Sequence, residues 1–355
     1  MPMRVQRTLT GVGGVQGLDG QAHRHRKGLF VDLLDGAAAT AIAEVFAVEW
    51  ARVIDKEPSR VVSVLDSASL ALCAAVSQWV GVTVEGAALR QRTDDLRAMI
   101  ESGARIGPGH WRGLLARRRA ERGLARTVRA VRRAPDAWGH PLREITTWTD
   151  VGGNPLPERI AAVEVLNVLR PTVAIARFVA FAAHAIAVRP GMRGRLAGDL
   201  SLQRSFVHEV RRFYPFFPVV AATAVQDVEF RGHTIPAGRR VLLDLYGTDR
   251  HPTECPRADE FVADRFAGPP DAFDVIPQGG GEVRTGHRCP GEAVTVAVLE
   301  ASLRVLVDRP DWLAEASTVD NRTVPTTPSG GLVLHWLDWP PILRDTPRSR
   351  NHTPA

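Results

Sequence analysis

The chain is predicted to fold as a mainly α protein with a small β component, and three stretches carry that prediction. From about Ala22 to Tyr214, apolar residues recur at a period near 3.6, which is typical of amphipathic helices. From Val219 to Leu245 the pattern changes to short apolar runs separated by Gly and Pro, which predicts strands joined by turns. A further long helix is expected from Glu292 toward Val307, followed by short extended pieces that end near Trp336.

The helical region is divided where Gly and Pro punctuate the pattern. Gly107-Pro108-Gly109 and Gly152-Gly153 mark two such breaks. Between them, the arginine-rich run 112–133 keeps apolar residues at helical spacing, which predicts an amphipathic helix with a solvated face. No repeat or linker divides the chain, so residues 1–339 are expected to form one domain. The Pro-, Arg- and Ser-rich stretch 340–355 is predicted to be a disordered tail.

Charge and cysteine content narrow the functional classes. The formal net charge is +6, and arginine supplies nearly all the positive charge because Lys27 and Lys56 are the only lysines. Genome composition explains this bias better than nucleic-acid binding, so no nucleic-acid partner is expected. The chain has three cysteines, no secretory leader and no apolar run judged long enough to cross a bilayer. These features predict a cytoplasmic protein without a transmembrane segment.

One cysteine lies in a setting that points to metal chemistry. Cys289 follows a glycine-rich loop that begins at Pro277, and it directly precedes the predicted helix at Glu292. Backbone N–H groups at such a helix start favour a thiolate with a lowered pKa, as an iron ligand requires. A lone cysteine is more often a small buried apolar residue, and Cys73 fits that description. Cys255 lies in a loop, and neither cysteine has a partner at metal-ligand spacing.

A second group of residues precedes the cysteine loop in the chain. Glu209 and Arg212 lie one helical turn apart, so they can form an ion pair. Arg265 follows, flanked by Phe261 and Phe266. A Glu-x-x-Arg pair is a weak signal by itself, because surface helices carry such pairs by chance. The pair becomes informative because Arg265 and then the cysteine loop follow it along the chain.

This ordered set resembles the cytochrome P450 superfamily, in which the Glu-x-x-Arg helix and a downstream arginine brace the loop of the haem-ligating cysteine. Further motifs resemble the fatty-acid peroxygenase branch: Gln16-Gly-Leu-Asp-Gly-Gln-Ala-His-Arg-His-Arg-Lys27, Asn167-Val-Leu-Arg-Pro-Thr-Val-Ala174, Arg211-Arg-Phe-Tyr-Pro-Phe216 and Leu243-Asp-Leu-Tyr-Gly-Thr248. Matching segments run from about Arg4 to the C-terminal strands. The resemblance therefore implies a P450 fold, and relative to the branch the chain is expected to lack an N-terminal portion.

The resemblance implies haem b as the cofactor, with Cys289 as the axial iron ligand. His23 and Lys27 lie four residues apart on one predicted helix face, where both can approach the haem propionates, and His287 is a further propionate candidate. Gln16 occupies the position that faces substrate above the haem in the branch. Glutamine there favours hydroxylation over decarboxylation. Each of these residues, taken alone, is more often an ordinary surface residue.

Arg170 and Pro171 carry the functional expectation. Reductase-dependent members of the superfamily have an acid next to an alcohol in the helix over the haem, and this chain has Arg170-Pro171 instead. Proline removes a helical N–H and kinks the helix. A buried arginine is costly unless an anion meets it, and a fatty-acid carboxylate suits its planar fork. Taken alone, the pair is equally consistent with a solvent-reaching arginine beside a plain kink.

The branch therefore implies hydroxylation of a fatty acid at the α or β carbon with hydrogen peroxide and without a redox partner protein. The substrate carboxylate would act as general acid–base. Two alternatives stay open at this level. One is a conventional reductase-dependent monooxygenase, and the other is an inactive haem-binding remnant.

Overall fold

A computed structural model describes residues 3–103, 105–271, 273–309, 312–320 and 322–337. The longer helices are α2 (Gly20–Leu33), α3 (Gly36–Asp55), α4 (Val64–Val80), α5 (Gly86–Ser102), α6 (Pro108–Arg133), α8 (Glu158–Ala174), α9 (Ala176–Ala187), α11 (Leu200–Phe213) and α13 (Glu292–Asp308). Shorter helical segments are α1 (Met3–Val5), η1 (Gln6–Thr10), η2 (Val15–Gly17), η3 (Pro135–Ala137), α7 (His140–Thr147), α10 (Met192–Leu196), α12 (Leu245–Thr248) and η4 (Ser329–Gly331). The predicted mainly α fold is confirmed.

The strands are β1 (Val61–Ser63), β2 (Val219–Thr223), β3 (Val228–Phe230), β4 (His233–Ile235), β5 (Arg240–Asp244), β6 (Trp312–Ala314) and β7 (Val333–Trp336). β2 pairs with β5 and β3 with β4, both antiparallel, so the predicted small sheet over 219–245 is confirmed as two hairpin-like ladders. β1, β7 and β6 form a separate antiparallel sheet. The sequence interpretation missed β1, because three residues are too few to show strand periodicity.

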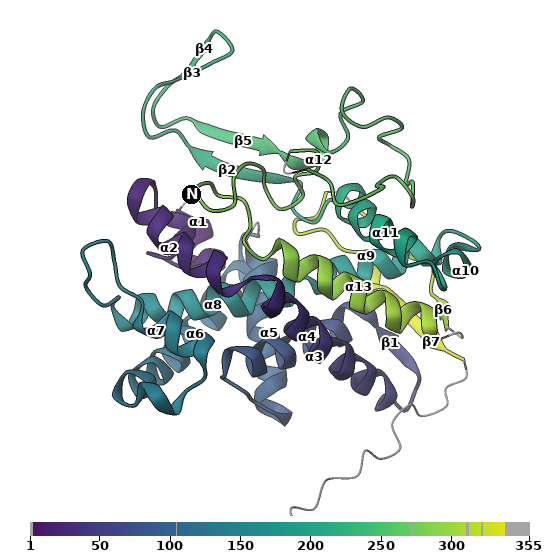
Figure 1. Cartoon of the computed structure of the whole chain (residues 1–355), viewed down its shortest axis with the longest axis horizontal. Coiled ribbons are helices and arrows are strands. Elements are labelled where there is room, and N and C mark those ends of the chain that lie inside the picture. The colour runs from purple at the N-terminus through teal and green to yellow at the C-terminus, as the bar shows by residue number, and fades with distance from the viewer. Residues whose placement is uncertain (1–2, 104, 272, 310–311, 321, 338–355) are drawn as a thin grey trace, which may run out of the picture.

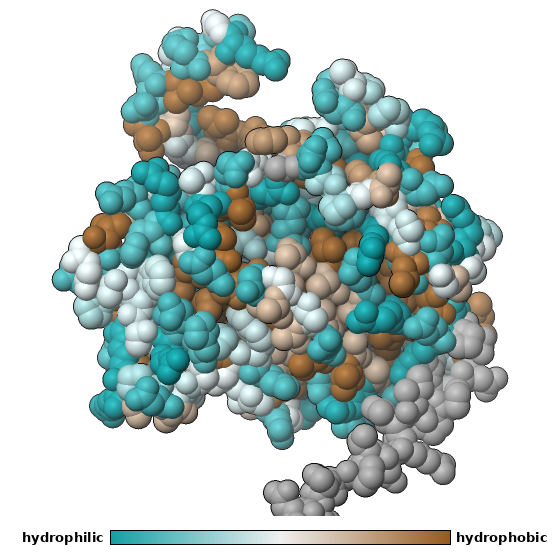
Figure 2. Space-filling model, viewed as in Figure 1, coloured by the Kyte–Doolittle hydropathy of each residue, from teal (hydrophilic) through white to brown (hydrophobic). Residues whose placement is uncertain are grey.

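The helices make the body of the molecule, and the two β2–β5 and β3–β4 ladders project from it (Figure 1). α3 packs against both α4 and α13, while α8 contacts α4, α5 and α6 at the centre. Buried apolar residues of these helices belong to one contiguous cluster. Apolar side chains remain exposed on the projecting ladders, among them Phe230 and Leu242 (Figure 2).

The central helices α8 and α9 need a correction to the sequence interpretation. Within the described residues, the stretch Glu158–Ala187 is long and apolar enough to cross a bilayer by composition, contrary to expectation. Its most apolar window is 94% buried inside the protein. Because neighbouring helices cover it, it is a core element of this fold. The predicted disordered tail, 340–355, lies outside the described residues.

Pro171 lies inside α8, which continues as far as Ala174 before α9 begins at Ala176. Proline has no N–H, so it cannot donate the helical hydrogen bond to the carbonyl of Asn167 four residues earlier. The missing hydrogen bond lies in the turn that carries Arg170, and the break between α8 and α9 follows four residues after Pro171, at Ile175.

Candidate haem-thiolate site

A cavity of about 620 Å³ lies between α2, α8, the β2–β5 ladder and the cysteine loop. Its wall includes each residue for which the sequence predicted a ligand, cofactor-binding or substrate role: Gln16, His23, Lys27, Arg170, Pro171, His287 and Cys289. Apolar side chains such as Val168, Ile175, Phe178 and Phe217 make up much of the remaining wall. The tertiary structure thus brings together residues as far apart in the sequence as Gln16 and Cys289, which are separated by 273 positions.

Cys289 is held by the loop that precedes α13. Its backbone N–H donates to the carbonyl of Gln278 at 3.1 Å, which folds the loop back on itself. Gly279 has a φ of +91°, a conformation that other residues rarely adopt. The backbone N–H of Gly291 and the side chain of Gln278 both hydrogen-bond the thiol. These donors aim at the sulfur as predicted.

The prediction that the loop itself lowers the pKa of Cys289 is wrong. Burial raises the pKa of the thiol, and this outweighs the opposing effects of the Gly291 N–H and the Lys27 ammonium. The sequence pattern shows the donors but not the desolvation. A coordinated cation deprotonates a thiol outright, so the donors stabilise a thiolate only once a metal is bound.

Two histidines and a lysine form one side of the cavity. The rings of His23 and His287 lie 4.0 Å apart between centroids. Burial lowers the pKa of His23 to about 4 and also lowers that of His287, so both rings are neutral near pH 7. Lys27 Nζ donates to the carbonyl oxygens of Gly286, at 3.2 Å, and Arg288. This group places N–H donors and one positive charge beside the cysteine loop.

Arg170 is buried in the cavity wall, and no carboxylate of the described residues pairs with it. Its Nη2 lies 3.4 Å from Asn167 Oδ1, and its Nε has no hydrogen-bond partner among the described residues. Burial, aided by the charge of Arg117, lowers the pKa of Arg170 to about 9. It is still protonated near pH 7. A buried cation with an unsatisfied donor favours an anion in the adjoining space.

Gln16 adds an acceptor to the same cavity. Its Oε1 atom is buried and has no hydrogen-bond partner among the described residues. It lies on η2, the short turn between η1 and α2, rather than on a long helix. A bound molecule with a donor group could satisfy that oxygen, because buried amide oxygens are rarely left unpaired.

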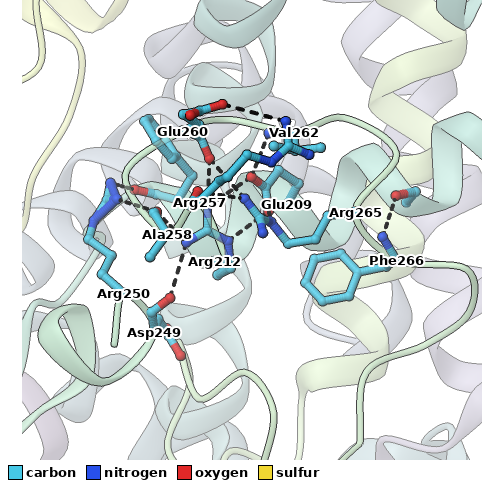
Figure 3. A network of polar contacts seen from close by, with 12 residues as sticks. Glu209, Arg212, Asp249, Arg250, Arg257, Ala258, Glu260, Val262, Arg265 and Phe266 are labelled. Atoms are coloured by element: carbon cyan, nitrogen blue, oxygen red, sulfur yellow. Dashed lines mark hydrogen bonds and ion pairs between the residues drawn. The ribbon is translucent and has the colours of Figure 1, made fainter. Parts of the chain in front are cut away.

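The residues predicted to brace the cysteine loop lie together in a separate buried cluster (Figure 3). Glu209 on α11 accepts from Arg212 Nε at 2.7 Å and Nη2 at 2.8 Å, from Arg265 Nε at 2.9 Å and from the backbone N–H of Val262 at 2.8 Å. The remaining guanidinium donors of Arg212 and Arg265 bind backbone carbonyls between 249 and 260. The cluster therefore fixes the long segment between the β2–β5 ladder and the cysteine loop.

Several site residues were not found by sequence reasoning. Gln278 contacts the thiol, and its side chain also bonds Thr295 and Arg211. Glu292, at the start of α13, pairs with Arg211 and with Arg288, the latter at 2.8 Å. Gln278 follows Pro277 at the start of the cysteine loop and Glu292 begins the next helix, so their nearness to Cys289 in the sequence was the available signal. Their partners on α11 become evident only in the folded chain.

A loop that presents one cysteine thiol to a large cavity, beside a helix start and facing a buried arginine, defines a haem-thiolate class of site. Comparisons with known proteins agree. Residues 195–321 match the family model for cytochrome P450. The structure superposes on cytochrome P450SP alpha (CYP152B1) in complex with (R)-ibuprophen with a TM-score of 0.88 and 37% identity, covering 94% of this chain and 84% of the other.

Two further solved structures give the same picture. Cytochrome P450EX alpha (CYP152N1) with myristic acid matches with a TM-score of 0.88 and 36% identity, and this chain covers 82% of it. A variant of cytochrome P450 OleT in complex with arachidonic acid matches with a TM-score of 0.87 and 31% identity, again over 82% of that chain. The chain belongs to the cytochrome P450 family. Within it, the chain is similar to the two CYP152 structures over 94% of its length.

Curated relatives match over a shorter region. Cytochrome P450 71D178 of Origanum vulgare is 33% identical over 119 residues, and cytochrome P450 71D179 of Thymus vulgaris is 32% identical over 136 residues. The chain's matched part spans about a quarter of the length of these plant relatives, 23% and 27% respectively.

The family implies a haem iron with a cysteine thiolate ligand, and the residues present fit that group. The sulfur of Cys289 faces the cavity and receives N–H donors suited to a thiolate. Gly279 and Gly280 leave the adjoining wall without side chains, so a flat group can approach the backbone closely. His23, Lys27 and His287 lie at the same end of the cavity and supply donors for acidic substituents.

Proposed function

We propose that this protein is a haem-dependent peroxygenase that hydroxylates fatty acids at the α or β carbon and consumes hydrogen peroxide. One observation carries the proposal: the buried guanidinium of Arg170, with its unpartnered Nε, lines the same cavity as Cys289. A carboxylate is the anion that best matches a guanidinium fork. The mostly apolar remainder of the wall suits an acyl chain.

The proposed cofactor is haem b; Cys289 would bind its iron, and His23, Lys27 and His287 would bind its propionates. When bound, thiolate-ligated haem supplies the chemistry that cleaves the O–O bond of peroxide. The substrate C–H becomes C–OH, and the second peroxide oxygen leaves as water. No reductase enters this balance, because peroxide brings both the oxygen and the oxidising equivalents.

The chain's residues bind and orient the substrate in this scheme. Arg170 holds the carboxylate at the buried end of the cavity, where apolar side chains exclude water. Pro171 leaves the Asn167 carbonyl without its helical donor on the turn that carries Arg170. The bound carboxylate moves a proton between the two peroxide oxygens, since the wall offers no acid–alcohol pair for that task. Gln16 contacts the substrate from η2.

The experiment compares turnover of myristate with hydrogen peroxide alone against turnover with NADPH and a redox partner. Arg170→Ala is expected to lower peroxide-driven turnover by at least about 100-fold, because substrate grip and proton transfer are both lost. In the Arg170→Ala variant, added acetate should restore part of the turnover, because a free carboxylate in the cavity can carry out the proton transfer that the poorly held substrate no longer performs. Arg129→Ala, which removes an exposed arginine of α6, is the control.

Three outcomes would reject the proposal. Unchanged turnover in Arg170→Ala would exclude carboxylate binding at this residue, and turnover only with NADPH and a partner would identify a conventional monooxygenase. A purified, haem-supplied protein without the thiolate–CO absorption band would instead be a haem-binding remnant or no haem protein at all.

A further inference from the structure

A row of buried polar side chains runs along α8 and ends at Arg170. Glu164, Asn167 and Arg170 follow one another at intervals of three residues, which places them on neighbouring turns. Asn167 Nδ2 donates to Glu164 Oε2 at 2.8 Å, and Asn167 Oδ1 lies 3.4 Å from Arg170 Nη2. Glu164 Oε1 accepts from Arg26 Nη1 on α2 at 2.7 Å. The row thus links α2 to the substrate end of the cavity.

Glu164 and Arg170, at the two ends of this row, determine how the side-chain amide of Asn167 between them is oriented. A carboxylate can only accept hydrogen bonds, and a guanidinium can only donate them. Asn167 must therefore turn its NH₂ toward Glu164 and its oxygen toward Arg170. If Glu164 could donate, the amide could turn over and present N–H groups to a guanidinium, which has no acceptor. The charge of Glu164 thus determines whether Arg170 has a hydrogen-bond partner on its own helix.

Glu164 also joins the other elements of the site. Besides Arg26 and Asn167, its carboxylate accepts from the backbone N–H of Val15, the residue before Gln16. Arg26 lies on α2, the helix that carries His23 and Lys27. The side chain of Glu164 is completely buried, and each of these partners is a donor. Such a set of partners favours the ionised carboxylate, although burial raises its pKa.

We propose that Glu164 is a positioning residue that acts through Asn167 to orient Arg170 for carboxylate binding and so gives the site its preference for acids over neutral lipids. This inference rests on the proposed function of Arg170. The competing explanation is that Glu164 only neutralises Arg26 and holds α2 against α8. The two explanations differ in what removal of the charge does to acids and to neutral ligands of equal length.

The test measures the affinity of the haem-loaded protein for decanoic acid and for 1-decanol by equilibrium dialysis. Glu164→Gln keeps the shape but removes the charge that orients Asn167. We expect its affinity for decanoic acid to fall about tenfold, the loss of one charge-assisted hydrogen bond. Its affinity for decanol should stay within about twofold, because that ligand does not need the guanidinium. Glu158→Gln is the matched control, since Glu158 lies on α8 but pairs with Arg129 at the surface.

Combined variants test the role of Glu164 separately from the proposed role of Arg170 in carboxylate binding. In an Arg170→Ala background, Glu164→Gln should cause no additional loss of acid affinity, because the residue through which it acts is gone. An unchanged acid-to-alcohol ratio in Arg170→Ala alone would reject the proposed function and this inference with it. A changed ratio in Arg170→Ala together with equal losses for both ligands, or no loss, in Glu164→Gln would reject the inference alone.

A second variant covers the case in which Glu164→Gln does not fold. Asn167→Leu leaves Arg26 and Glu164 in place as an ion pair but removes both hydrogen bonds of the amide, the one to Glu164 and the one to Arg170. It should also lower decanoic acid affinity selectively. Full acid preference in a folded Asn167→Leu protein would overturn the proposal.

Discussion

Replacing Glu209 with alanine tests the buried cluster that braces the cysteine loop. Glu209 is completely buried, and its carboxylate accepts four hydrogen bonds from Arg212, Arg265 and the Val262 backbone. Burial by itself lowers the pKa of Arg212, but its hydrogen bonds to Glu209 raise the pKa above its ordinary value. Both guanidiniums therefore depend on this carboxylate as their counter-charge.

The expected loss of stability follows from the two buried guanidiniums that lose their carboxylate partner in Glu209→Ala. Arg212 is almost completely buried and keeps only backbone carbonyls as partners, while Arg265 is mostly buried and does the same. Removing one partner of a buried ion pair costs about 3–5 kcal/mol, because the remaining charge cannot regain its hydration. We expect Glu209→Ala to lower the free energy of unfolding by at least that amount. An exposed pair such as Glu158–Arg129 should contribute less than about 1 kcal/mol.

Urea unfolding followed by tryptophan fluorescence gives the free energy for the wild type, Glu209→Ala and the surface control Glu158→Ala. Haem retention after gel filtration is the second readout, because the cluster fixes the segment that leads to Cys289. A loss below about 1 kcal/mol together with full haem retention would show that the guanidiniums do not depend on Glu209. The reasoning from buried counter-charges would then be refuted.

Two further predictions concern stability. Burial raises the pKa of Asp249 from 3.8 to about 6, against the opposing Ile276 N–H and Arg212 charge, so the native state binds this proton more tightly than the unfolded chain. The stability that this proton contributes is fully present below about pH 4 and is lost as the pH rises through about 6. In Asp249→Asn, stability should therefore not fall by the corresponding amount of about 3 kcal/mol over this pH range. Parallel pH–stability curves for the wild type and the variant would contradict this prediction. In α6, a Cβ on Gly113 would lie 2.1 Å from Ser102 Oγ, so Gly113→Ala should lower stability by about 1–3 kcal/mol. Gly123→Ala on the same helix, with nothing within 4 Å, should raise the melting temperature slightly, and equal behaviour of the two alanine variants would contradict the packing argument.

Much of the fold could be predicted from sequence because its signals are local. Helical periodicity extends over ten or more residues in elements such as α6 and α13, so it survives any tertiary context. The turns between β2 and β5 carry their own Gly and Pro signals. β1 could not be found this way, because its pairing partner β7 lies at the other end of the chain.

The sequence by itself determined the pattern of residues by which the family is recognised: Cys289 before a helix, Glu209 one turn from Arg212, and Arg170 next to Pro171. Each is a short-range arrangement, so neighbouring positions and helical geometry suffice to recognise it. Only the tertiary structure decided which charges become buried and what they meet there. Arg26 reaches Glu164 across 138 positions, and the part of the chain that the structure describes surrounds Arg170 without bringing a carboxylate to it. Burial is a sum over many distant neighbours, so the raised pKa of Cys289 and the charge-based orientation of Asn167 could not be read from any local motif.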